Sequence, residues 1–473
     1  MSPAAPMNVK EYVSHDAVGL AERIRRKDVS ASEVVETAIN LTEHVNPKIN
    51  AVAERTFDAA RKRASSDLAG AFAGVPMFVK DTDALVGSVT RMGSHAMPNV
   101  PAKRSSPFVE KILLPLGFIP VGKSTLPEFG LTGTTESLLM GPTRNPWNLD
   151  HSTGGSSGGS GAMVASGVLP MSHANDGGGS IRIPAAWCGL VGLKCSRGRL
   201  PGMESEAIMP VDLIAQGMLS RNVSDTAAFF AAAEQVYPTA LPAIGRVEGA
   251  SSERLRVGFF TEGPAGETCD PEVVDAVHRA ANVMAGLGHK VEEMPNPFDA
   301  ALLDDFFIFW GYMPFALRFF GRFAMGRGFR FREVDDWTRG MARYFGRNIL
   351  RAPGAIRRLR RSASTAAGVF QSHDLLLSPV LTQPPLPIGT LTPDRPFEEV
   401  FEMLRPIASF TPYQNATGAP ALSLPAGVGT KNLPMSVHVA APFGMERRLL
   451  EVAYELEGAA PWASAYPLLA AEG

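Results

Sequence analysis

The 473-residue chain has few cysteines and almost no net charge. Its three cysteines, Cys188, Cys195 and Cys269, show neither metal-ligand spacing nor a disulfide framework, which favours a reducing location such as the cytoplasm. The formal net charge of −2 provides no general attraction to nucleic acid. We therefore expect a cytoplasmic protein without a nucleic-acid partner.

Long hydrophobic runs are missing as well. No uninterrupted apolar stretch is long enough to cross a membrane, and residues 1–10 lack the apolar segment of a signal peptide. Hydrophobic residues make up 45% of the chain and charged residues 19%, a balance that suits a soluble protein with a large core. Neither secretion nor a membrane partner is expected from these features.

Two serines and one lysine stand out in the remaining sequence. Ser156 lies in the Gly-Gly-Ser-Ser-Gly-Gly-Ser loop of residues 154–160, and Ser180 lies in Asn-Asp-Gly-Gly-Gly-Ser-Ile-Arg of residues 175–182. Lys80 ends the apolar run Met-Phe-Val, as expected at the end of a buried strand. A snorkelling lysine, a flexible linker or a helix N-cap would explain each piece alone. Their joint occurrence instead favours one shared site.

The chemistry of these residue types predicts a serine hydrolase whose base is a lysine. A serine hydroxyl is a weak nucleophile until a base takes its proton. A lysine can be that base only when it is neutral, so its side chain must be desolvated and its pKa lowered. The glycines beside Ser180 let backbone N–H groups converge on the negative oxygen that develops during acyl transfer.

Residues 154–200 resemble the amidase signature family. The chain contains the family's GGSSGGS block, its D-x-G-G-S-I-R-x-P-A block at 176–185, and its C-G-x-x-G-L-K block at 188–194. The Lys80 segment and residues 46–51, 142–147 and 418–425 are also similar to family positions. The resemblance therefore covers most of the chain and is weakest at about 240–370.

The resemblance implies a role for each of these residues. Lys80 would be the base, Ser180 the nucleophile, and Ser156 the proton relay, after a cis peptide bond following Gly155. The expected oxyanion hole consists of the backbone N–H groups of Gly177, Gly178, Gly179 and Ser180. The expected loop supports are Ser157, Asp176 and Arg182. No metal or cofactor is implied.

Three positions depart from the usual family pattern. Asn175 replaces a common threonine, Gly177 replaces a bulkier residue, and Cys195 replaces a common proline. Three successive glycines are expected to loosen the oxyanion loop or to admit a larger acyl group. The change at Cys195 is expected to affect packing only.

Three competing motifs are rejected. Residues 117–124 match the phosphate-binding pattern GxxxxGK[ST], but Phe, Ile, Pro and Val fill the loop positions, which predicts a buried strand and turn. Residues 154–158 match GxSxG, but the preceding residues 148–153 are polar and do not form the expected apolar strand. His173 is too close in sequence to Ser180 to suggest a Ser-His-Asp triad, and we expect a structural role for it.

Hydrophobic periodicity predicts alternating helices and strands and therefore an α/β fold. The expected helices lie within 16–46, where Ser30 and Ser32 are cap candidates and Glu33 lies in the first turn, and at 162–167 and 271–288. The expected strands lie at 118–121, 255–260 and 375–377, and a loop is expected at 238–255. The family resemblance implies a single large α/β/α sandwich with a mixed central sheet. One domain would span residues 1–473, with a signature core at about 65–235 and an inserted region at about 300–365.

The inserted region is rich in aromatic and arginine residues. Residues 318–361 contain 13 arginines and three acids. The inserted region would form a cover over the substrate pocket or a surface that rests on lipid. Alternatively, it would form a pair of helices whose aromatics pack on the core and whose arginines face water. We favour packing for most aromatics and expect one or two to line the pocket. Which residues of 130–136 join them is left open.

The resemblance is strongest to 6-aminohexanoate cyclic-dimer hydrolases and aryl acylamidases, through residues 142–149, 173–176 and 456–462. It implies a hydrolase of C–N bonds in small hydrophobic or aryl amides, acting through an acyl-enzyme, with ester and carbamate (urethane) cleavage as further activities. Three alternatives stay open: the amidase-type subunit of a glutamine-dependent amidotransferase, a peripheral membrane lipid-amide hydrolase, and a non-enzymatic binding protein. Homo-oligomer formation is also left open.

Overall fold

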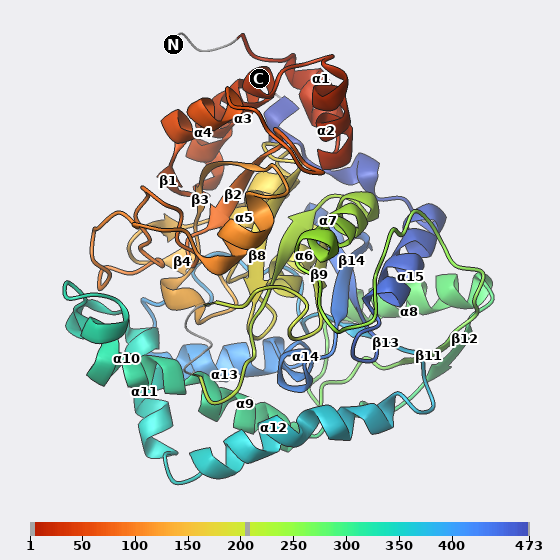
Figure 1. The fold of residues 1–473 in the computed structure, drawn as a ribbon. Helices are drawn as coiled ribbons and strands as arrows, with labels where there is room; N and C mark the ends of the chain where they lie inside the picture. Colours follow the sequence, from red (N-terminus) through yellow and green to blue (C-terminus); the bar gives the residue numbers. More distant parts are fainter. Residues whose placement is uncertain (1–4, 204–208, 472–473) are drawn as a thin grey trace.

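A computed structural model describes residues 5–203 and 209–471 of the chain (Figure 1). Residues 1–4, which belong to the N-terminal segment in which no signal peptide is expected, lie outside the described residues. Strands form a large mixed sheet with helices packed around it, which confirms the predicted α/β class. The largest cluster of buried apolar side chains joins the N-terminal helices to this sheet.

The main sheet has eight strands. In spatial order they are β12 (Lys290–Glu293), β11 (Arg256–Phe259), β13 (Leu375–Pro379), β15 (Pro434–Ala440), β14 (Ala421–Val428), β9 (Val191–Lys194), β10 (Ala215–Ser220) and β8 (Met171–Asp176). The first three strands are parallel to one another, and every later pair is antiparallel. The strands predicted at 255–260 and 375–377 are therefore present, at β11 and β13.

A separate three-stranded sheet continues beyond β8. It contains β1 (Val52–Arg55), β3 (Ile119–Ser124) and β2 (Pro76–Lys80), with β3 in the middle. Side-chain hydrogen bonds connect β2 to β8: Ser172 Oγ donates to the Phe78 carbonyl (3.2 Å), and the Lys80 N–H donates to His173 Nδ1 (3.1 Å). Side chains thus join the two sheets at this boundary, and they place Lys80 beside the end of β8.

The predicted helices are present, with boundaries that differ by two to four residues. Ser30 caps α3 (Ala31–Ile49) in a reciprocal capping box with Glu33, as the sequence suggested. The helix expected at 162–167 is α5 (Gly158–Ala165), which begins four residues earlier. Gly158 and Gly159 enter the helix because they fit against buried threonines, where a Cβ would lie within 2.4 Å of a side-chain oxygen. The other helices of the core are α1 (Val9–Ser14), α2 (Ala17–Arg26), α4 (Phe57–Ala64), α6 (Arg182–Cys188), α7 (Val223–Val236), α8 (Pro271–Gly286), α13 (Phe397–Ile407), α14 (Pro412–Thr417) and α15 (Glu446–Ala459).

The inserted region forms four helices rather than the expected pair. They are α9 (Ala300–Trp310), α10 (Tyr312–Ala324), α11 (Asp336–Arg347) and α12 (Ala352–Val369). The chain turns between α9 and α10 at Gly311, where a Cβ would lie 2.7 Å from the Met341 carbonyl oxygen of α11. By length and composition residues 300–324 would qualify as a membrane-spanning helix, although no uninterrupted apolar run was expected. Half of the qualifying window is buried inside the protein.

Candidate active site

The candidate site forms where β2, β8 and the two glycine-rich loops meet. All five residues of β2 are buried, so its last residue, Lys80, extends from an apolar strand into the protein interior. Strand β8 ends at Asp176, and the loop that carries Ser180 follows directly and leads into α6. The Ser156 loop leads into α5, whose residues are all buried.

Lys80 and Ser156 form the central contact. Lys80 Nζ lies 2.7 Å from Ser156 Oγ, and both residues are almost completely buried. Burial lowers the pKa of Lys80 to about 7, and the charges of Asp176 and Asp83 offset this effect only in part. A large fraction of Lys80 is therefore neutral near pH 7 and able to accept a proton.

Asn175 is the second partner of this lysine. Lys80 Nζ also lies 2.7 Å from Asn175 Oδ1, while Asn175 Nδ2 donates to Thr82 Oγ1 at 2.7 Å. A neutral amine has one lone pair, and an N–H directed at Asn175 leaves that lone pair available for Ser156. The departure from threonine at this position thus supplies a second hydrogen-bond acceptor for Lys80, which the sequence did not predict.

Ser156 and Ser180 both border the loop that contains Gly130. The peptide bond between Gly155 and Ser156 is cis, as the family resemblance implied. Ser156 Oγ lies 3.1 Å from the position that a Cβ on Gly130 would occupy, and Ser180 lines a hollow together with Gly130. Within residues 5–203 and 209–471, Ser180 Oγ makes no hydrogen bond to Ser156 or to any other residue, so its hydroxyl is available to a ligand in that hollow.

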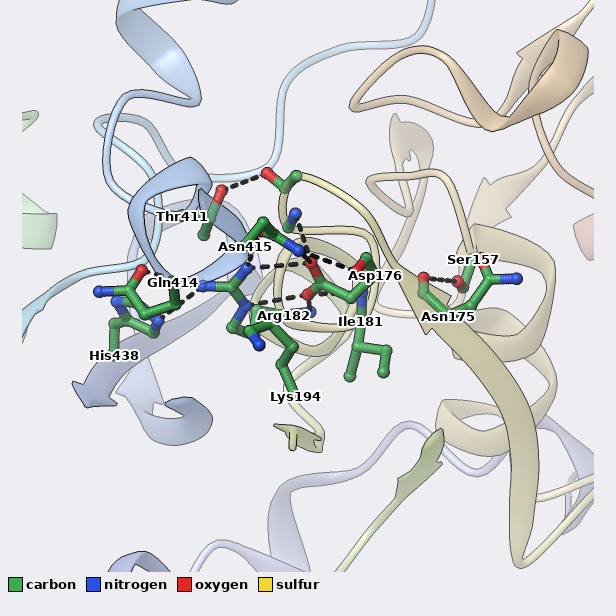
Figure 2. Close-up of polar contacts among 12 residues, drawn as sticks. Ser157, Asn175, Asp176, Ile181, Arg182, Lys194, Thr411, Gln414, Asn415 and His438 are labelled. Atoms are coloured by element: carbon green, nitrogen blue, oxygen red, sulfur yellow. Dashed lines mark hydrogen bonds and ion pairs between the residues drawn. The ribbon is translucent and has the colours of Figure 1, made fainter. Parts of the chain in front are cut away.

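The oxyanion loop differs in one respect from the prediction. The Gly179 N–H donates to Asp176 Oδ1 at 2.7 Å, so this N–H is already occupied. Thr411 Oγ1 donates to the Gly178 carbonyl at 2.7 Å, so the peptide group between Gly178 and Gly179 is held at both its N–H and its carbonyl (Figure 2). In the described part of the chain the N–H groups of Gly177, Gly178 and Ser180 have no hydrogen-bond partner. These three, rather than four, remain free to stabilise a developing negative charge.

Asp176 and Arg182 anchor the loop from below (Figure 2). Arg182 donates from Nε to Asp176 Oδ2 and from Nη2 to Oδ1, both at 2.9 Å, and both side chains are fully buried. Burial alone would raise the pKa of Asp176, but the charge and hydrogen bonds of Arg182 outweigh it and hold this pKa well below its usual range. Ser157 Oγ donates to the Asn175 carbonyl at 3.3 Å. The structure thus places the three predicted support residues around the loop.

Helix α14 supplies partners that the sequence analysis missed. Asn415 Nδ2 donates to the Asp176 carbonyl (2.8 Å) and to Asp176 Oδ1 (2.9 Å), and its Oδ1 accepts from Arg182 Nη2 (2.6 Å). Gln414 Oε1 accepts from Arg182 Nη1 at 3.2 Å. The family-like segment 418–425 begins just after α14 and was the only sequence signal near it.

The three successive glycines make room for aromatic side chains. A Cβ on Gly177 would lie 2.7 Å from the Trp310 ring, and a Cβ on Gly178 would lie 2.7 Å from the Phe306 ring. Helix α9 therefore packs directly on the oxyanion loop. The space left by the glycines is filled by these rings, so the loop is neither loosened nor opened in the way the sequence suggested.

The hollow above Ser180 is narrow and mostly apolar. Its walls are Gly130, Leu131, Thr132, Gly133, Gly178, Ile183, Phe306, Phe307, Trp310, Leu404, Ala408 and Pro412. The indole N–H groups of Trp310 and Trp337 both donate to the Leu131 carbonyl, at 3.1 and 3.2 Å. Three aromatics of the inserted region, Phe306, Phe307 and Trp310, thus line the pocket where one or two were expected, and residues 130–133 line it with them.

The competing motifs have structural roles. Both ring nitrogens of His173 are occupied, Nδ1 by the Lys80 N–H and Nε2 by Gln216 Oε1 at 2.8 Å. Lys123, in the phosphate-binding pattern, lies buried in β3 and pairs with Asp81 at 2.6 Å. The strand before the GxSxG match, β7 (Asn148–Ser152), pairs with the two-residue strand β6 (Arg144–Asn145) and, through an isolated bridge at His151, with Pro387. It lies outside the main sheet.

Comparison with known proteins agrees with this geometry. The family model described as Amidase matches residues 33–450. The chain belongs to the amidase signature family. This amidase is 42% identical to a Mycobacterium leprae protein named as amidase AmiC over 450 residues (95% of this chain and 96% of the relative). It is 36% identical to 6-aminohexanoate-cyclic-dimer hydrolase of Paenarthrobacter ureafaciens over 481 residues (96% of each chain).

Solved structures share the whole amidase fold. A 6-aminohexanoate cyclic dimer hydrolase complexed with substrate is 32% identical, with a TM-score of 0.85 over 97% of this chain and 99% of that chain. A bacterial aryl acylamidase is 27% identical, with a TM-score of 0.84 over 96% and 98% of the two chains. The amidase is therefore an enzyme that hydrolyses carbon–nitrogen bonds, as the sequence predicted.

Proposed function

We propose that this amidase hydrolyses small hydrophobic or aryl amides with Lys80 as base, Ser156 as proton relay and Ser180 as nucleophile. The observation that carries the proposal is the contact of 2.7 Å between Lys80 Nζ and Ser156 Oγ in a fully buried environment. Burial lowers the pKa of Lys80 to about 7, which gives the site a neutral amine in place of a histidine.

The proposed reaction has two halves. Lys80 takes the proton of Ser156, Ser156 takes the proton of Ser180, and Ser180 Oγ forms a bond to the carbonyl carbon. The free N–H groups of Gly177, Gly178 and Ser180 stabilise the oxyanion. The C–N bond then breaks as the same relay returns a proton to the leaving nitrogen. Water attacks the resulting ester by the reverse path and releases the acid and free Ser180.

The apolar walls of the hollow support the proposed substrate class. Phe306, Phe307 and Trp310 line the hollow together with Ser180 and residues 130–133. A flat or slender apolar acyl group would bury its surface between them. Esters and carbamates form the same type of tetrahedral intermediate, so we include them as secondary substrates.

A panel of chromogenic substrates tests this proposal. Wild type, Ser180→Ala, Lys80→Ala and the exposed-lysine control Lys62→Ala would each be assayed with an aryl anilide, a linear aminohexanoate amide, a p-nitrophenyl ester and an aryl carbamate. We expect Ser180→Ala and Lys80→Ala to abolish anilide cleavage and Lys62→Ala to retain it. Full activity of Ser180→Ala would contradict the assigned roles. Activity that depends on an added partner subunit would instead favour the amidotransferase alternative.

A further inference from the structure

Helix α10 carries an exposed aromatic surface. Phe319, Phe320 and Phe323 are 62%, 66% and 94% exposed. The opposite face of the helix buries Leu317 and Gly321, where Gly321 meets the Phe329 ring. The helix is therefore apolar on both faces, whereas a helix at the protein surface usually has one apolar face and one polar face. It lies at the edge of the molecule, beside α11 (Figure 1).

Arginines surround these phenylalanines. Arg318, Arg322, Arg327, Arg330 and Arg332 line a shallow hollow together with Phe319, Phe329 and Phe331. All five arginines are exposed, and residues 311–332 contain no acidic residue. We call the three exposed phenylalanines and these five arginines the α10 surface.

Most of this positive charge is not neutralised. Glu333 pairs with Arg330 at 3.2 Å and lies 3.7 Å from Arg332. Arg318, Arg322 and Arg327 form no ion pair with any residue that the structure describes, and the Arg318 guanidinium lies 5.7 Å from the centre of the Phe319 ring. The α10 surface therefore presents apolar rings and free positive charge to the same partner.

We propose that the α10 surface docks the enzyme on an anionic lipid membrane. The phenylalanine rings would enter the boundary between headgroups and acyl chains, and the arginines would contact lipid phosphates. Because half of the apolar window at residues 300–324 is buried in the protein, the helix would lie on the bilayer rather than cross it. The sequence favoured packing over a lipid-resting surface for this region and kept a peripheral membrane hydrolase as an alternative. The exposure of the three phenylalanines supports that alternative.

Charge argues against a second copy of the chain as the partner. A symmetric contact through the α10 surface would bring two sets of these arginines together, and like charges at an interface weaken it. An anionic bilayer offers the opposite sign of charge over a large area.

The α10 surface begins about two helical turns after Trp310, so docking would bring the hollow above Ser180 close to the membrane.

Vesicle flotation of the full-length enzyme tests this inference. Vesicles of phosphatidylcholine alone would be compared with vesicles that also contain phosphatidylglycerol. We expect binding to the anionic vesicles only, weakened by added salt. A triple variant with Phe319→Ser, Phe320→Ser and Phe323→Ser should lose binding. Substituting Arg318→Gln, Arg322→Gln and Arg327→Gln should reduce it by about fivefold for each arginine.

Two controls separate docking from other causes. Leu350→Ser removes another apolar side chain that is 94% exposed, outside the α10 surface, and should bind as wild type does. All variants should cleave a water-soluble substrate at the wild-type rate, which shows that they fold. Absence of binding by wild type, equal binding to both vesicle types, or a homodimer that the triple Phe variant dissociates would overturn the proposal. These outcomes do not depend on the proposed roles of Lys80, Ser156 and Ser180.

Discussion

Asn175 shows how one side chain can set the geometry of a base. It accepts from Lys80 Nζ and is itself held by Thr82. Neither contact follows from the residue's place in the sequence motif, which identified Asn175 only as a departure from threonine. The motif made Lys80, Ser156 and Ser180 the candidates, because the predicted chemistry depends on residue type. The partners of their side chains depend on atomic positions that residue type alone does not specify.

The first prediction concerns the pH dependence of activity. Only neutral Lys80 can accept a proton, and burial lowers its pKa to about 7. We therefore expect kcat/KM to fall below pH 7, to rise through about pH 7 and to level off above it. A pH–rate profile in water with a non-ionising anilide measures this directly. A flat profile down to pH 5 would show that the lysine is not the titrating base.

The second prediction concerns Asn175. Asn175→Leu removes the acceptor that orients Lys80, so kcat should fall by about tenfold to a hundredfold with little change in KM, because the pocket walls are untouched. Asn175→Asp places a negative charge beside Lys80 and should raise the pKa of the lysine, moving the acid limb of the profile to higher pH. Comparing pH profiles of both variants with wild type distinguishes orientation from charge. If neither variant changes the profile or kcat, Asn175 has no positioning role.

At the level of elements, helix α9 and the oxyanion loop are fitted to each other. Phe306 and Trp310 occupy the space that side chains at Gly178 and Gly177 would need. The sequence predicted the aromatic helices and the glycine loop separately. It could not pair them, because residues more than a hundred positions apart come together only through the tertiary fold. A pair of helices was expected where the chain forms four, in part because the break at Gly311 depends on its close approach to the Met341 carbonyl of α11.

A third prediction follows from this fit. Gly178→Ala places a methyl group against the Phe306 ring and should lower kcat/KM on an anilide, because the loop must move to accept it. Combining Gly178→Ala with Phe306→Ala should restore part of the activity. A double-mutant cycle on kcat/KM should show a coupling of about 0.5–3 kcal/mol. Strictly additive losses would mean that the two positions do not interact.

At the scale of the whole molecule, the buried contact of Asp176, Arg182 and Asn415 joins distant parts of the chain. Asn415 lies 239 residues after Asp176 in the sequence. The loop beside Ser180 is therefore held by a helix that is completed only near the end of the chain. The family resemblance predicted the α/β sandwich and the support roles of Asp176 and Arg182. The contribution of α14 has no sequence motif of its own.

The fourth prediction concerns stability. Arg182→Met leaves the Asp176 carboxylate buried without the arginine that pairs with its charge and should lower the free energy of unfolding by about 3–5 kcal/mol. Asn415→Ala leaves fewer buried polar groups without a hydrogen-bond partner and should lower the free energy of unfolding by about 1–3 kcal/mol. Urea unfolding measures both, with Arg256→Met as a control that breaks a partly exposed ion pair with Asp374. An Arg182→Met protein as stable as the control would contradict the anchoring role.

The hydrogen bond between His173 and the Lys80 backbone has a consequence for how this enzyme would look in a mutational screen. Replacing His173 would withdraw support from the end of β2 and shift the lysine that the strand carries. Activity would fall, and a screen would list the histidine beside the serines, as if it exchanged protons with substrate. Replacing His173 should nonetheless leave the midpoint of the pH–rate profile unchanged, because that midpoint reflects the pKa of Lys80. His173 thus positions the strand that carries Lys80, and its replacement would lower activity in the same way as the loss of a catalytic residue.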